Sequence, residues 1–188
     1  MFTALFDIQI NFSMLWLDTV SAGSAWASFA HAGIPHEGTI LDSIAKFSGK
    51  MDIHRFNSSF VLRYRSLWDK VMGLLILIMN PANYERFHSA GSKKTAFKKF
   101  AVEFWPAESV QQLLDVLQRF DDSFRTAEAH GTGILRKYSF TMDTLDKTPH
   151  IQLIGYWNLL NAVVSEVGKV IDAGPDASAW PLKLQMPA

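Results

Sequence analysis

The chain has 188 residues, of which 48% are apolar and 13% aromatic, and its 18 basic side chains balance its 18 acidic ones. This length suits one well-filled core, so we expect a single helical domain over residues 1–172 and an extended tail over residues 173–188. The absence of cysteine excludes disulfides, thiolate nucleophiles and cysteine metal sites, and the neutral net charge argues against a wholly basic nucleic-acid binder. A cysteine-free composition suits the reducing cytoplasm, where we expect the protein to reside.

Apolar residues recur at three- and four-residue steps over residues 5–29, which predicts an amphipathic helix ending near "HAGIPHEG". A polar stretch follows, with one expected helical turn over residues 40–47. A second apolar stripe over residues 60–78 predicts the central helix. Asn80-Pro81 ends this helix, because proline lacks an amide hydrogen and forces the preceding residue out of helical geometry.

Two short helical segments are predicted next. One is a turn over residues 84–88, and the other is the basic segment "SKKTAFKKF", for which Ser92 is the expected N-cap. A third stripe over residues 110–124, with Pro106 tolerated in its first turn, predicts a long helix that stops at Gly131.

A last helix is predicted from Thr148-Pro149, as N-cap and first helical residue. Its expected inward residues are Leu153, Trp157, Leu160, Val164, Val167 and Ile171. The chain shows no strand alternation, internal repeat or dividing linker, and its longest apolar run is shorter than the ~20 residues of a membrane span. The sequence therefore predicts an all-α bundle of four to five main helices without a membrane segment.

The stretch "FRTAEAHGTG" places Arg125 and His130 at the end of the third stripe. An arginine binds a phosphate at two points and stays charged, while a histidine takes or gives a proton near neutrality. This pair suits phosphodiester cleavage without a metal, with histidine moving the proton and arginine holding the developing negative charge.

An ordinary helix end explains the same residues. Cations are favoured at a helix C-terminus and glycine is a common cap, and Arg125 has Asp121 and Glu128 within one turn for surface ion pairs. At 100° per residue, Arg125 and His130 also point about 140° apart on one continuous helix. They converge only where the helix breaks or where two protomers meet.

A basic run precedes the third stripe. Residues 86–100 carry five Lys or Arg and no acid, whereas residues 101–130 carry six acids against two arginines. The lysines either pair with that acidic helix or form a phosphate-binding patch together with two cations that follow the histidine. The residues of this predicted nucleic-acid-binding set are Lys93, Lys94, Lys98, Lys99, Arg136 and Lys137.

Metal and cofactor chemistry is not predicted. Glu85 and His88 form a single E-x-x-H unit, whereas di-iron bundles need a second copy and further glutamates. Four other histidines, including His54 and His150, lack metal-ligand spacing, so we expect them to be surface or capping residues. No glycine-rich phosphate loop or nucleophile elbow is present.

The helical pattern with "RTAEAH" near a helix end resembles the HEPN superfamily, whose motif separates arginine and histidine by four to six residues. The similarity covers residues 55 to 170 in outline and includes "YRSLWDKVMGLL" and "YWNLLNAVVSEV". Thr126 departs from the pattern of active members, which often carry Asn, Asp or His at that position.

The resemblance implies a homodimer whose motif helices meet, with metal-independent RNA cleavage in active members and roles in toxin–antitoxin and defence systems. On that basis Arg125 would hold the scissile phosphate and His130 would transfer the proton. The alternative is a non-catalytic helical module that binds a second copy or a protein partner through its apolar surplus.

Overall fold

The computed structural model describes residues 2–31, 40–103, 105–130, 132–133, 135 and 148–173. Within these ranges the protein is an all-α bundle without strands, as the periodicity predicts. The described part of the chain contains no helix with the length and apolar character needed to cross a membrane. Ala173, the predicted first residue of the tail, is instead the last residue of the final helix, and residues 174–188 lie outside the described residues.

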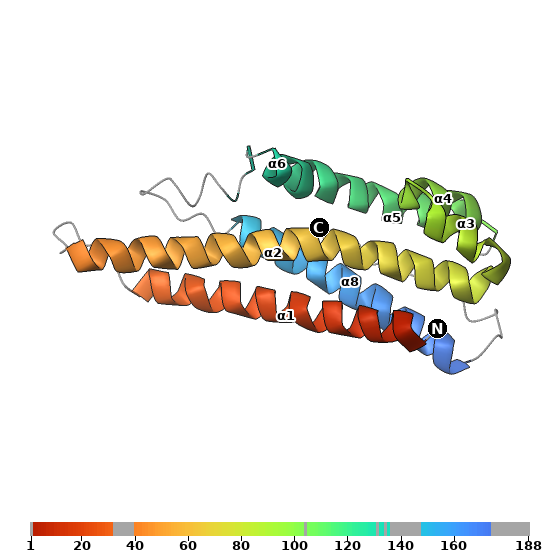
Figure 1. Ribbon diagram of the computed structural model, residues 1–188, viewed down its shortest axis with the longest axis horizontal. Helices are drawn as coiled ribbons and strands as arrows, with labels where there is room; N and C mark the ends of the chain where they lie inside the picture. The colour runs from red at the N-terminus through yellow and green to blue at the C-terminus, as the bar shows by residue number, and fades with distance from the viewer. Residues whose placement is uncertain are drawn as a thin grey trace.

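Three long helices form the frame of the bundle. They are α1 (Phe2–His31), α2 (Ile40–Met79) and α8 (Thr148–Ala173), and each contacts the other two (Figure 1). The end of α1 at His31 and the stop of α2 before Asn80-Pro81 confirm the predicted boundaries. α8 begins at Thr148 itself, one residue earlier than its expected first helical residue.

α2 is longer than predicted, because the expected turn over residues 40–47 is continuous with the central helix. Only Gly49 interrupts the helix-compatible residues there, at a cost of about 1 kcal/mol. Tertiary contacts offset that cost: Ile53 and Asn57 are buried, and Asn57 Oδ1 lies 3.2 Å from Nδ1 of His150 at the start of α8. His150 is thus a buried partner of α2, and its prediction as a surface or capping residue is wrong.

Shorter helices cover one side of α2. They are η1 (Pro81–Asn83), α3 (Tyr84–Ser89), α4 (Lys93–Ala101), α5 (Ala107–Phe120), the π-helical turn η2 (Asp121–Arg125) and α6 (Thr126–Ala129). Ser92 caps α4 as predicted, since its side chain accepts a hydrogen bond from the Thr95 amide. Pro106 is the N-cap of α5 rather than a residue of its first turn.

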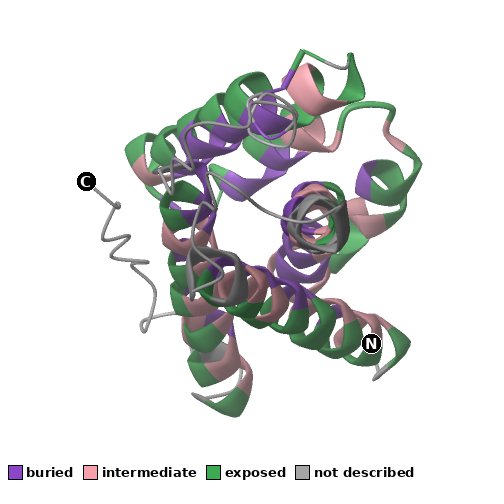
Figure 2. Ribbon diagram, turned by 90° about the vertical axis from the view of Figure 1, so that its left-hand side faces the viewer, coloured by how far each residue is buried: buried purple, intermediate pink, exposed green. Residues whose placement is uncertain are grey.

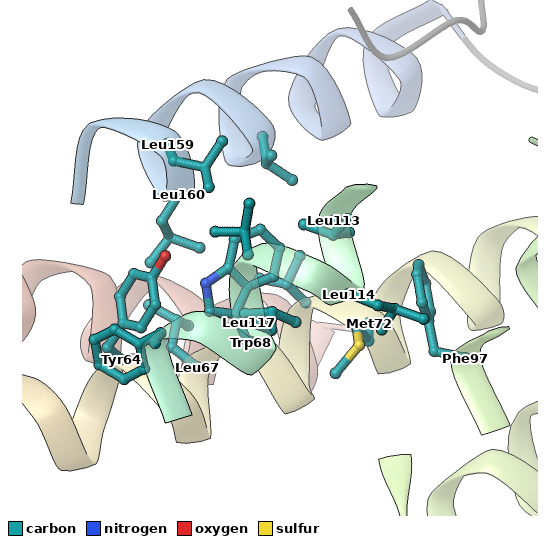
Figure 3. Packing of buried hydrophobic residues seen from close by; sticks show 14 of the residues in the cluster. Tyr64, Leu67, Trp68, Met72, Phe97, Leu113, Leu114, Leu117, Leu159 and Leu160 are labelled. Carbon is teal, nitrogen blue, oxygen red and sulfur yellow. The ribbon is translucent and has the colours of Figure 1, made fainter. Parts of the chain in front are cut away.

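The core lies where α2, α5 and α8 meet. Buried residues face this junction and exposed residues face away from it (Figure 2). The fully buried Trp68 of α2 lies among leucines of α5 and α8, including Leu117 and Leu160 (Figure 3). Tyr64, one turn earlier, packs its ring 4.4 Å from that of Phe120. This aromatic contact fixes the end of α5, from which the candidate site is built.

Candidate functional site at the end of α6

α5 continues without a loop into the π-helical turn η2 and then α6. Buried Phe120 and Phe124 hold this turn against α8, with ring centroids 4.9 and 5.9 Å from that of Tyr156. A π-turn inserts an extra residue into a helix and is common at functional sites. The same turn ends at Arg125, so the aromatic contacts fix the point on the continuous helix from which this predicted site residue projects.

Arg125 is exposed, with 52% of its side-chain surface accessible. Its Nη1 lies 3.8 Å from Oδ1 of Asp121, which confirms the expected one-turn ion pair. A single long contact engages few of the five guanidinium N–H donors, so the others remain available to a phosphate. Glu128, the second expected partner, instead accepts a hydrogen bond of 3.1 Å from the amide of Leu135.

His130 is the C-cap of α6 and is also exposed. Its backbone is no longer helical (φ −90°, ψ 3°), although its amide still donates a hydrogen bond of 3.1 Å to the Thr126 carbonyl. Within the described residues its imidazole has no hydrogen-bond or ion-pair partner. The histidine is therefore both a helix end and an accessible proton carrier, and four α6 residues still separate it from Arg125.

Asp121 is the electrostatic centre of this region. Its carboxylate is buried, and its Oδ2 receives Lys94 Nζ at 2.8 Å and Arg65 Nε at 3.4 Å. Arg65 also pairs with Asp69, one helical turn later on α2. Arg65 and Lys94 balance the charges of Asp121 and Asp69, so exposed Arg125 is the one cation in excess in this cluster. An excess cation at an exposed position favours an anionic ligand.

Asp121 also brings two of the predicted site residues together. Arg125 comes from η2 and Lys94 from α4, and the sequence assigned them to different roles. The signal for this convergence is a carboxylate within an apolar stripe: Asp121 lies four residues after Leu117 and three before Phe124, both buried. The contact between Asp121 and Arg65 could not be predicted from residue spacing, because the two residues are 56 positions apart in the sequence.

The lysines of α4 contact the protein in four different ways. Lys93 donates to the carbonyls of Phe87 and His88 at the end of α3. Lys94 binds Asp121 and also Gln118 at 2.8 Å, so it does pair with the acidic helix. Lys98 donates to Gln111 at 2.7 Å, and Lys99 lies over the ring of Phe100; both side chains are exposed. Their nucleic-acid contacts stay a prediction.

Two residues of the predicted nucleic-acid-binding set, Arg136 and Lys137, lie outside the described residues. Glu85 and His88 are exposed on α3, and no group of three or more His, Asp or Glu side chains in the described ranges is arranged to hold a metal ion.

Comparison with models of protein families, with curated proteins and with solved structures finds no match to this chain. Its function is therefore proposed from its own residues and geometry.

Proposed function

We propose that the protein is a HEPN-like helical domain that binds RNA and cleaves it at the end of α6. The observation that supports this proposal is the exposure of both motif side chains, Arg125 and His130, with Arg125 the one cation in excess in the Asp121 cluster. An exposed arginine with free donors binds a phosphodiester, and an exposed imidazole transfers protons at neutral pH.

In the proposed reaction the RNA 2′-oxygen bonds to the adjacent phosphorus and the bond from phosphorus to the 5′-oxygen breaks. The products are a 2′,3′-cyclic phosphate and a free 5′-hydroxyl. His130 accepts the 2′-hydroxyl proton or delivers a proton to the leaving oxygen. Arg125 contacts the non-bridging oxygens, where negative charge develops.

Two protomers are part of this proposal. α6 is regular helix over Thr126–Ala129, so the π-turn that precedes it does not remove the angular gap of about 140° between Arg125 and His130. Two α6 segments that meet across a twofold axis would place Arg125 of one chain beside the partner's His130. The homodimer is thus a requirement of the proposed cleavage.

Cleavage of a single-stranded RNA in the presence of a chelator tests the proposal. We expect His130→Ala and Arg125→Ala each to lower the rate by about 10²–10⁴-fold, the range of acid–base and oxyanion-type contributions. The matched controls, His54→Ala and Arg55→Ala on α2, should cleave at the wild-type rate. Wild-type protein without activity, or equal rates for all four variants, would remove the nuclease assignment.

A second candidate function is supported by a different part of the molecule. Large apolar side chains of α1, among them Phe6 and Leu17, are exposed. A non-catalytic helical interaction module would use such a surface, and its binding would resist salt, whereas binding to RNA phosphates weakens steeply as salt rises.

A further inference from the structure

α1 carries apolar residues on two opposite faces. The inward face contributes Ile8, Leu15, Ala22 and Trp26, all buried. The opposite face repeats large apolar residues at steps of three or four positions and is exposed. These residues, here called the outer stripe, are Phe6 (63% exposed), Ile10 (45%), Met14 (36%), Leu17 (54%) and Val20 (44%). A helix that is apolar all round is normally covered on both sides.

The outer stripe carries no charge. The carboxylates of α1, Asp7 and Asp18, both turn toward α2, where Asp7 pairs with Lys70 and Asp18 lies 3.2 Å from Arg63. Asp18 also accepts a hydrogen bond of 2.8 Å from Ser59. A partner with a charged surface would therefore find no opposite charge on the outer stripe. A second copy of the stripe could pack against it without repulsion between like charges.

The size of the surface fits a dimer. Trp16 is 47% exposed and widens the stripe toward α8, where its ring lies 4.7 Å from that of Trp157. A fully exposed aromatic side chain has a surface of about 150–250 Å². Scaled by their exposed fractions, the side chains of the outer stripe and Trp16 together expose an apolar area on the order of 500 Å². Two copies would bury about 1,000 Å² together, which is about the minimum for a biological interface and below the ~1,200–2,000 Å² of stable ones.

We infer that the outer stripe of α1 is the contact surface for a second copy of this chain. The two α1 helices cross antiparallel about a twofold axis near Ser13, the midpoint of the stripe. This arrangement sets the two helix dipoles antiparallel, which is electrostatically favourable. The inference deepens the second candidate function and does not depend on RNA cleavage.

The mass of the full chain in solution at about 10–100 µM tests this interface. We expect a dimer for the wild type, a monomer for Leu17→Arg, and a dimer for the matched control Ile151→Arg, whose side chain is 61% exposed on α8. Circular dichroism confirms that each variant is helical. A monomeric wild type, or a Leu17→Arg protein that stays dimeric, overturns the inference.

Cross-linking locates the contact independently of any folding effect. Because the chain has no cysteine, Ser13→Cys introduces the single thiol, and only a residue near the twofold axis meets its own copy. We expect a covalent dimer under oxidising conditions for Ser13→Cys and none for Ser165→Cys, exposed on α8. A protein that dimerises only through α6 would give no Ser13 cross-link and would retain its mass in Leu17→Arg, which rejects this interface while leaving the proposed cleavage intact.

Discussion

The buried guanidinium of Arg65 and the buried carboxylate of Asp121 lie 3.4 Å apart and join the centre of α2 to the π-turn that ends at Arg125. Lys94 of α4 forms an ion pair with the same carboxylate. One aspartate therefore ties together three segments that are distant in sequence, and the position of the candidate site depends on it.

Removing the Asp121 charge should weaken the fold. In Asp121→Asn, Arg65 keeps Asp69 but loses a buried counter-ion, so we expect a loss of about 2–4 kcal/mol in the free energy of unfolding, near the range for broken buried pairs. Chemical denaturation measures this loss. The neighbouring Asp122 is exposed and contacts only Gln118 among the described residues, so Asp122→Asn should change stability by less than about 0.5 kcal/mol. Equal effects of the two substitutions would contradict a structural role for the buried charge.

The turn after α6 should depend on Gly133. A Cβ at this position would lie 1.9 Å from Oε1 of Glu128, the atom that accepts the Leu135 amide, and 3.1 Å from the Glu128 Cα. Gly133→Ala should therefore displace the Glu128 side chain and break this hydrogen bond, lowering stability by about 1 kcal/mol. Gly91→Ala, where a Cβ meets nothing within 4 Å, is the matched control for thermal unfolding. If both variants unfold at the wild-type temperature, the Glu128 contact has no stabilising role.

The exposed lysines of α4 should set the salt dependence of RNA binding if the proposed function holds. Each phosphate contact contributes about 0.9 to the slope of log affinity against log salt for duplexes and about 0.7 for single strands. We therefore expect Lys98→Gln with Lys99→Gln to reduce the slope by about 1–2. Lys169→Gln, at an exposed position of α8 paired with Glu166, should leave the slope unchanged. Identical slopes for the three proteins would place RNA contact elsewhere.

Helix-period stripes predicted the fold well, because each main helix buries one apolar face and ends at strong local signals such as Asn80-Pro81. The site was predicted less completely. Residue spacing placed Arg125 near Asp121, but the contact between Asp121 and Arg65 arises from packing across 56 residues. Trp16 shows the same limit: it belongs to the predicted periodic set of α1, yet it is half-exposed because that helix is apolar on two faces.

The aromatic cluster under the site predicts an alkaline limit of stability. Burial raises the pKa of Tyr64 above its ordinary value of 10.0, and the neighbouring Trp68 side chain opposes this effect only in part. The unfolded chain releases this proton from about pH 10 upward while the folded protein retains it, so the contribution is complete below pH 10 and is lost as pH rises further. One such group lowers stability by up to about 1.4 kcal/mol per pH unit.

Tyr64→Phe isolates this effect from the titration of lysines. At pH 7 the variant should be within about 1 kcal/mol of the wild type in stability, because it removes a fully buried hydroxyl and keeps the ring contacts with Phe60 and Phe120. Above pH 10 its advantage over the wild type should grow with pH. Tyr84→Phe, on the surface helix α3, should follow the wild-type curve. Denaturation series at pH 7 to 11 measure both differences, and parallel curves for Tyr64→Phe and wild type would show that the hydroxyl ionises equally in the folded and unfolded chains.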